Sequence, residues 1–225
     1  MNDSSHTRAL PRYDLVIFDF DGTLADSFDW FWTFLPTLTQ RFRLTPLDWS
    51  TRDAYRHLSA RALVARLGVR WWQGPGIARY ARRCMTEQAG QIPLFEGVPD
   101  MLRHLRASGV TIAIVTSNSR TNVARILGPQ LAALVDHYGC GAPILGKKRL
   151  TQRVMRQAGA SPARTLCIGD ELRDADVARV VGADFAPVSW GYTLPEAFVV
   201  SGFGPAIPAL PAVAERVLGH AAAPG

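Results

Sequence analysis

The sequence predicts an α/β fold in which helices cover both faces of a parallel sheet. Short, nearly continuous apolar runs recur along the chain, and such runs are typical of strands that are buried on both faces. Helix-like patterns separate these runs, and strands that alternate with helices form βαβ units. The chain has 225 residues, of which 48% are hydrophobic, so it is large enough to bury such a core.

The predicted strands cover residues 13–18, 111–115, 165–168 and, more weakly, 184–188. Each run is followed by a cluster of polar residues. In an open parallel sheet, ligands bind beyond the carboxyl ends of the strands. We therefore expect these polar clusters, although far apart in sequence, to line one crevice.

The predicted helices between these strands cover residues 98–108, 121–127, 150–158 and 175–181. Gly109 directly follows the first of them, as is common at the end of a helix. The segment after Tyr192 either adds a last short helix or stays partly mobile.

Residues 26–94 contain no strand-like run, and their pattern is helical. We expect this segment to form a small helical domain inserted between the first two strands, with residues 1–25 and 95–225 forming the α/β core domain. Hinges are expected near Ala25 and at residues 95–97, where a glycine can absorb backbone rotation. Tryptophans are concentrated in the insert, and we expect them mainly to fill its core: Trp30, Trp32, Trp49, Trp71 and Trp72.

Composition excludes several classes of protein. No apolar run approaches the roughly 18 residues that a membrane-spanning helix needs, and the N-terminus lacks the apolar stretch of a secretory signal, so we expect a cytoplasmic protein. Cys84, Cys140 and Cys167 are an odd number without metal-site spacing, so we expect reduced, mostly buried thiols.

The net charge of +6 raises nucleic acid as a partner. The arginines are scattered, however, and no nucleic-acid-binding motif organises them. Nucleic-acid binding therefore stays a remote alternative, and a solvated basic surface that steers anions is the preferred interpretation.

Lysine is rare in this chain. Only Lys147 and Lys148 are present, so 23 of the 25 basic residues are arginine. A position that keeps the compact point charge of lysine in such a chain is a candidate for a specific role.

Two polar clusters follow the first two predicted strands. Asp19 and Asp21 are two residues apart, so both side chains project the same way if the strand geometry persists. Thr116, Ser117 and Asn118 follow the second strand. This second cluster fits a helix N-cap as well as it fits a phosphate-binding turn.

The cluster after the third strand is the most acidic. Asp170, Glu171 and Asp174 place three carboxylates within five residues. So many anions near Asp19 and Asp21 would repel one another unless a cation lay among them, and oxygen ligands of this kind suit Mg²⁺.

In this order, the clusters resemble those of the haloacid dehalogenase-like hydrolase superfamily, on its phosphatase side. The resemblance covers residues 13–190 and rests on DFDGTL, which begins at Asp19, and on GDELRD, which begins at Gly169. It is closest to the phosphoglycolate phosphatase-like and β-phosphoglucomutase-like branch. The resemblance implies a Rossmann-like core and identifies the insert with the family's small helical C1 cap.

The resemblance implies a role for each aspartate. Asp19 would be the nucleophile that forms an aspartyl-phosphate, and Asp21 would be the general acid and base, a residue that the dehalogenases lack. Mg²⁺ would be held by the Asp19 carboxylate, the Asp21 backbone carbonyl and Asp170. Asp174 would either join the metal ligands or orient the lysine, and Glu171 would do either or neither.

The remaining motif residues would bind the phosphoryl group. Thr116 would do so through its hydroxyl, with the amides of Ser117 and Asn118 assisting, and Gly22 belongs to the same predicted site. Lys147 is favoured as the phosphate-binding lysine because it follows Gly146 directly. Its spacing to the expected helix is short, so Lys148 stays an alternative.

The expected activity is therefore Mg²⁺-dependent hydrolysis of a small organic phosphomonoester, with a small phosphorylated metabolite as the only expected partner and no membrane association. The alternative with the same chemistry is a sugar-phosphate mutase.

Residues 26–94 contain no lysine, which disfavours the Schiff-base route of the related phosphonatases. Arginines of the insert could clamp an anionic substrate: Arg41, Arg52, Arg56, Arg66, Arg82 and Arg83. The sequence identifies neither the substrate nor the oligomeric state.

Overall fold

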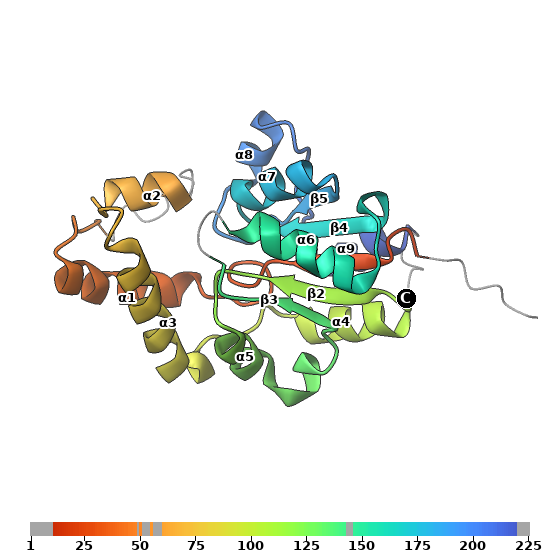
Figure 1. Ribbon diagram of the computed structural model, residues 1–225, viewed down its shortest axis with the longest axis horizontal. Helices are drawn as coiled ribbons and strands as arrows, with labels where there is room; N and C mark the ends of the chain where they lie inside the picture. Colours follow the sequence, from red (N-terminus) through yellow and green to blue (C-terminus); the bar gives the residue numbers. More distant parts are fainter. Residues whose placement is uncertain (1–10, 49, 51–54, 56–59, 143–145, 220–225) are drawn as a thin grey trace, which may run out of the picture.

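The computed structural model describes residues 11–48, 50, 55, 60–142 and 146–219 (Figure 1). These residues contain a five-stranded parallel sheet of order β3-β2-β1-β4-β5. The predicted α/β fold is confirmed. The strands are β1 (Leu15–Phe18), β2 (Thr111–Val115), β3 (His137–Gly139), β4 (Thr165–Gly169) and β5 (Asp184–Pro187).

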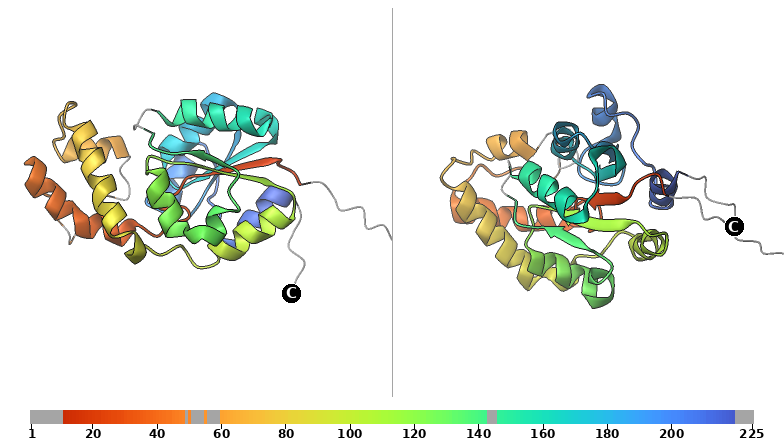
Figure 2. Two further views of the ribbon diagram at one scale, coloured as in Figure 1. Left: turned by 60° about the horizontal axis from the view of Figure 1, so that its bottom comes forward. Right: turned by 45° about the vertical axis from the view of Figure 1, so that its right-hand side comes forward.

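Helices cover both faces of the sheet, as expected (Figure 2). Successive side chains of a strand point to opposite faces, so Leu15 and Ile17 of β1 pack with one layer and Val16 and Phe18 with the other. The first layer contains α6 (Lys147–Ala158) and α7 (Leu172–Val181). The second contains α4 (Val98–Ala107), α5 (Arg120–Ala132) and α9 (Pro211–Leu218).

Some element boundaries differ from the predicted ones. The α6 helix begins at Lys147, three residues before the predicted start, and α5 extends beyond its predicted end through a kink at Gly128, where φ is +70°. Strand β3 was not predicted, because its three residues, HYG, form no apolar run. The segment after Tyr192 forms α8 (Pro195–Val200) as well as the last helix, α9.

The described part of the insert is helical, with α1 (Phe28–Phe42), α2 (Ala60–Arg66), α3 (Gly74–Glu87) and the 3₁₀ turn η2 (Ala89–Gln91). Its two connections to the sheet region run antiparallel to each other. The Asp26 N–H donates to Pro93 O at 2.9 Å, and the Phe95 N–H donates to Leu24 O at 3.0 Å. The chain therefore leaves and re-enters the sheet region at one place, which lies beside the predicted boundaries. That residues 26–94 form a separate domain stays a prediction.

The prediction that tryptophans fill the core of the insert is correct only in part. Trp32 is buried with Phe34 and Leu35, and Trp30 packs beside them. Trp71 and Trp72 are 86% and 57% exposed. These two residues lie in the turn before α3, where their neighbours do not cover them, and Trp49 lies outside the described residues.

The three cysteines carry free thiols, as expected, but only Cys167 is fully buried. Burial raises the pKa of the Cys140 thiol to about 11 and that of Cys167 to about 12, so both are protonated at neutral pH. In the described ranges, none of the helices combines the length and apolarity needed to cross a bilayer.

Candidate active site

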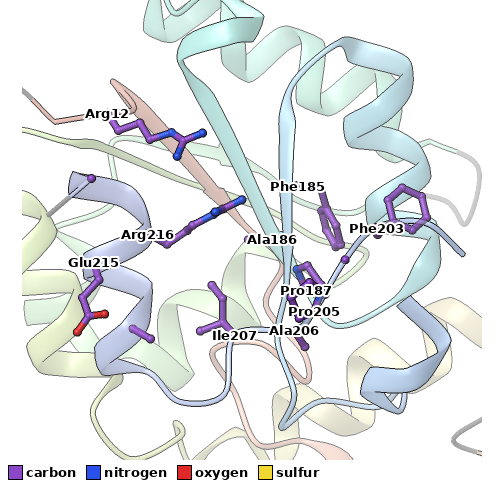
Figure 3. A pocket seen from close by; sticks show the side chains of 13 residues that line it. Arg12, Phe185, Ala186, Pro187, Phe203, Pro205, Ala206, Ile207, Glu215 and Arg216 are labelled. Atoms are coloured by element: carbon purple, nitrogen blue, oxygen red, sulfur yellow. The ribbon is translucent and has the colours of Figure 1, made fainter. Parts of the chain in front are cut away.

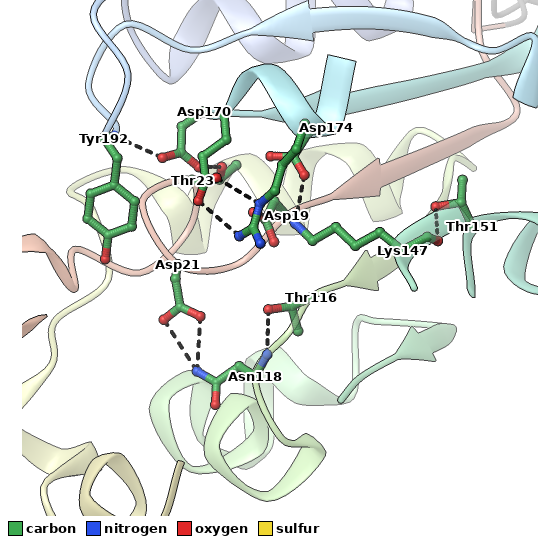
Figure 4. A network of polar contacts seen from close by, with 12 residues as sticks. Asp19, Asp21, Thr23, Thr116, Asn118, Lys147, Thr151, Asp170, Asp174 and Tyr192 are labelled. Atoms are coloured by element: carbon green, nitrogen blue, oxygen red, sulfur yellow. Dashed lines mark hydrogen bonds and ion pairs between the residues drawn. The ribbon is translucent and has the colours of Figure 1, made fainter. Parts of the chain in front are cut away.

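The carboxyl ends of three neighbouring strands bring together the residues of the site (Figure 4). Asp19 follows β1, Thr116 follows β2 and Asp170 follows β4. Because β2 and β4 flank β1 in the sheet, their carboxyl ends meet at one edge. All three side chains are buried, so the expected crevice is a largely dehydrated polar centre.

Lys147 is the first residue of α6, and its side chain reaches into this centre. Its Nζ lies 2.7 Å from Asp19 Oδ2 and 2.7 Å from Asp174 Oδ1. Burial lowers the pKa of Lys147, but attraction by Asp174 and Asp19 outweighs it and raises the pKa overall. Lys148, the next residue on the helix, is exposed. The geometry thus places Lys147, and not Lys148, beside the candidate nucleophile.

Asp19, Asp170 and Asp174 form a buried acidic cluster in which one oxygen of each lies within 4.8 Å of the others. Burial raises the pKa of Asp19 to about 7, although Lys147 opposes the shift. Burial also raises the pKa of Asp170 well above its ordinary value, and the charges of Glu171 and Asp19 add to this effect. Several buried anions at such short separations are stable only with a compensating positive charge.

The donor set fits a divalent cation. Asp174 Oδ2 is buried and accepts no hydrogen bond from the described residues. The ligands are carboxylate oxygens, which are the ligands that Mg²⁺ prefers. The residues present therefore match the expected metal.

Two glycines leave room for the Asp170 carboxylate. A Cβ at Gly22 would lie 2.3 Å from Asp170 Oδ2, and one at Gly191 would lie 2.1 Å from the Asp170 Cβ. The carboxylate is fixed by Thr23 Oγ1, which donates to Oδ1 at 2.8 Å, and by the Tyr192 N–H, which donates to Oδ2 at 2.8 Å. Gly22 was expected beside the phosphate; in the structure it packs against Asp170.

The Asp21 carboxylate is held by side-chain donors from two segments. Asn118 Nδ2 donates to it, at 3.1 Å from Oδ2 and 3.3 Å from Oδ1, and the Ser27 hydroxyl also bonds to it. Burial raises the pKa of Asp21, and these two hydrogen bonds oppose the shift. A carboxyl group that stays protonated more readily than usual is suited to donate a proton. Ser27 Oγ also lies 2.7 Å from the Tyr192 hydroxyl.

The cluster at residues 116–118 does not cap the following helix. Ser119 is the N-cap of α5, and its hydroxyl accepts the Asn122 N–H at 3.1 Å. The Asn118 N–H donates to Thr116 Oγ1 at 3.0 Å, while Ser117 O accepts a bond from Arg82 of α3 at 3.2 Å. The capping alternative therefore applies to Ser119, and the turn at 116–118 faces the site.

Glu171 pairs with an arginine that the sequence patterns did not single out. Arg173 donates from Nη2 to Glu171 Oε1 at 2.9 Å, and its Nε lies 2.7 Å from Oε2. Burial lowers the pKa of Arg173, and attraction by Glu171 and Asp174 outweighs it. Glu171 thus neutralises Arg173, whereas Asp174 is the carboxylate that contacts Lys147.

Three further residues at the site were not predicted: Ser27, Asn122 and Tyr192. For Tyr192 a weak signal was present, because it lies in the segment that follows β5, although not directly after the strand as Asp170 does after β4. Ser27 and Asn122 lie close in sequence to their partners Asp21 and Asn118, but the sequence patterns singled out neither of them.

Two surface hollows lie away from this centre. One, of about 590 Å³, lies between β5, residues 203–207 and α9, and its lining includes Phe185, Arg12 and Arg216 (Figure 3). The other, of about 580 Å³, lies on the insert between the end of α1 and α3. Neither is lined by the acidic cluster, so the site is identified by its chemistry and not by the size of a hollow.

Comparison with known proteins agrees with these motifs. Residues 16–188 match the family model described as haloacid dehalogenase-like hydrolase. A phosphoglycolate phosphatase from Synechococcus elongatus is 34% identical over 178 residues, which cover 79% of this chain and 84% of that protein. An N-acetylmuramic acid 6-phosphate phosphatase from Pseudomonas aeruginosa is 27% identical over 201 residues, which cover 82% and 85%.

The fold is shared with solved structures of low sequence identity. The crystal structure of a predicted phosphatase from Clostridium acetobutylicum superposes with a TM-score of 0.77 at 18% identity. The superposition covers 91% of this chain and 97% of the other.

Proposed function

Because the chain belongs to the haloacid dehalogenase-like hydrolase family, on its phosphatase side, we propose that it is a Mg²⁺-dependent phosphomonoesterase that works through an aspartyl-phosphate on Asp19. One observation carries this proposal. Asp19 is buried beside Lys147 and within a cluster of carboxylates that could hold a metal ion.

The residues that would hold Mg²⁺ are Asp19, Asp170 and the backbone carbonyl of Asp21. When bound, the metal supplies positive charge that stabilises the transferring phosphoryl group. Asp174 is the partner of Lys147 in this proposal, since the two side chains lie 2.7 Å apart.

In the first step, the Asp19 carboxylate attacks phosphorus while the bond between phosphorus and the ester oxygen breaks. Asp21 gives its proton to the leaving alkoxide, which departs as an alcohol. The raised pKa of Asp21 supports this assignment, because the group keeps a proton above the pH at which an exposed aspartate loses it. Lys147 neutralises charge on the phosphoryl oxygens.

In the second step, Asp21 removes a proton from water as the water attacks phosphorus, and the bond to Asp19 breaks to release phosphate. Thr116 and the backbone amide of Ser117 hold the phosphoryl group in both steps. Their place at the carboxyl end of β2, beside Asp19, supports this role.

Substrate selection is proposed to involve Arg82. Of the insert's candidate arginines, Arg41 stacks over Tyr80 and Arg83 pairs with Glu87, whereas Arg82 reaches Ser117 O. Arg66 lies over the Tyr55 ring, and Arg52 and Arg56 lie outside the described residues. Arg82 is thus placed to contact an anionic leaving group, and a relative named for phosphoglycolate supports a small anionic substrate.

The test is phosphate release by the purified protein from a panel containing p-nitrophenyl phosphate, phosphoglycolate and sugar phosphates, with Mg²⁺ or with EDTA. Asp19→Asn should remove the activity, whereas Asp100→Asn, the same change at an exposed helical carboxylate, should not. Equal turnover by Asp19→Asn and the parent chain would refute the nucleophile.

A further inference from the structure

Helix α3 of the insert is connected to Asp21 by a chain of hydrogen bonds through two asparagines. Asn122 Nδ2 donates to Arg82 O of α3 at 3.0 Å and to Asn118 Oδ1 at 2.8 Å. Asn118 Nδ2 then donates to the Asp21 carboxylate at 3.1 Å. The chain begins on the insert and ends at the proposed acid and base, and Figure 4 shows its last link, from Asn118 to Asp21.

The orientation of the Asn118 amide follows from this arrangement. Its Oδ1 accepts from two donors, Asn122 Nδ2 and the Ser119 N–H, both at 2.8 Å. Rotation of the amide by half a turn would set its NH₂ group against both donors and its oxygen against the Asp21 carboxylate. The two donors to Oδ1 therefore keep Nδ2 directed at Asp21.

Asn122 is in turn held by the insert. Its side chain is completely buried at the start of α5. Its Nδ2 bonds to Arg82 O, and its Oδ1 accepts a hydrogen bond from the Thr86 hydroxyl. Both ends of this amide thus contact α3, so its position depends on where that helix is seated.

We propose that Asn122 is a positioning residue that couples the seating of α3 on the core to the orientation of the Asp21 carboxylate. When α3 is seated, Asn122 fixes Asn118 and Asn118 fixes Asp21. When α3 lifts away, Asn122 loses both of its partners on the insert, and the Asn118 amide is held firmly by the Ser119 N–H but less firmly by Asn122. This inference rests on the proposed function, because it assumes that Asp21 transfers the proton.

Asn122→Asp is the sharpest variant. It keeps the size and shape of the side chain but replaces the donor toward Asn118 Oδ1 and Arg82 O with an acceptor. General acid and base catalysis contributes about 10² to 10⁴ in rate. For an alkyl phosphate we expect kcat to fall by about 10², while KM changes by less than about threefold because Asn122 does not contact substrate.

p-Nitrophenyl phosphate separates the two steps. Nitrophenolate is a stable anion that leaves without a proton, so formation of the aspartyl-phosphate needs Asp21 little, whereas the attack of water still needs it. In rapid mixing, Asn122→Asp should release one equivalent of nitrophenolate at a rate within about threefold of the parent chain. Its steady-state rate should be lower by about 10².

Arg125→Gln is the matched control. Arg125 is exposed on α5 and donates from Nη1 to Thr86 O of α3 at 3.0 Å, so it joins the same two helices. It contacts the backbone carbonyl of Thr86, whereas the chain to Asp21 involves the Thr86 hydroxyl and Asn122. This variant should keep the parent's burst and steady-state rates.

Asn122→Ala is a second variant for the case in which the buried charge of Asn122→Asp prevents folding. Alanine removes the donor without burying a charge. Thermal melting by circular dichroism should show a folded protein, and the same slow second step is expected. A uniform loss with both substrates and no burst, or an equal defect in Arg125→Gln, would overturn the proposal. Absence of Mg²⁺-dependent turnover in the parent chain would instead overturn the proposed function, and this inference with it.

Discussion

Lys147 Nζ lies 2.7 Å from Asp19 Oδ2, and neither side chain is more than 6% exposed. A second carboxylate, Asp174, holds the same ammonium at 2.7 Å from the other side. The lysine is therefore confined between the candidate nucleophile and a supporting anion.

Lys147→Arg should lose turnover by about 10² to 10³, the range found when one electrostatic contact to a transition state is removed. The guanidinium is planar and bulkier than an ammonium, so it cannot take the same buried position between Asp19 and Asp174. Lys148→Arg is the matched control at an exposed neighbour and should keep the parent's kcat. The reverse result would reassign the lysine.

Metal binding should stabilise the protein more at pH 8 than at pH 5. Burial raises the pKa of Asp19 from 3.8 to about 7, so between roughly pH 4 and 7 the unfolded chain binds fewer protons than the folded one. The free energy of unfolding of the metal-free protein should therefore fall as the pH rises through this window. Mg²⁺ should offset this loss once the carboxylates have ionised.

The measurement is the melting temperature in EDTA and in excess Mg²⁺ at both pH values. At about 100 times the dissociation constant, Mg²⁺ adds about 2.7 kcal/mol, or roughly 5–10 °C. Asp170→Asn should abolish most of this difference. Equal stabilisation at pH 5 and pH 8 would contradict the assignment of protons to these carboxylates.

Gly22→Ala should destabilise the protein more than Gly109→Ala does. Both glycines have positive φ, +78° and +81°, so either alanine incurs about 1–2 kcal/mol of backbone strain. Only at Gly22 does the new Cβ meet another group, Asp170 Oδ2 at 2.3 Å, and overpacking there should cost about 1–3 kcal/mol more. Urea unfolding of the two variants measures the difference, and equal midpoints would show that Asp170 can move aside.

Arg82→Gln should raise KM about tenfold for a phosphomonoester whose leaving group carries a carboxylate. The reason is the loss of one charge-assisted hydrogen bond, worth about 1.5 kcal/mol. For a substrate with an uncharged leaving group KM should not change. Arg79→Gln, at an exposed position on the same helix, is the control. An equal rise in KM for both substrates would assign Arg82 to the phosphoryl group instead.

The sequence patterns predicted the sheet well because parallel strands are buried on both faces and so appear as apolar runs. The same rule located Asp19, Thr116 and Asp170, since the carboxyl ends of adjacent strands meet. Strand β3 was not predicted, because it is short and forms no apolar run. Its position is set by pairing with β2.

Contacts made across the insert could not be predicted from local patterns. Asn122 bonds to Arg82 and Thr86 of α3, and Ser27 bonds to Tyr192, so these contacts join segments that are far apart in sequence. The exposure of Trp71 has the same origin, because composition says which residues prefer burial but not which positions have neighbours to bury them.

The pairing of Ala25 with Leu94 has a consequence for how such a chain changes over time. The ends of the inserted segment are already tied together by backbone hydrogen bonds, so the entropy needed to close that loop depends little on what lies between them. A shorter, longer or unrelated segment can be spliced in at this point without altering the spacing of the strands. The length of the insert is therefore free to change at a different rate from the strands of the sheet within one gene.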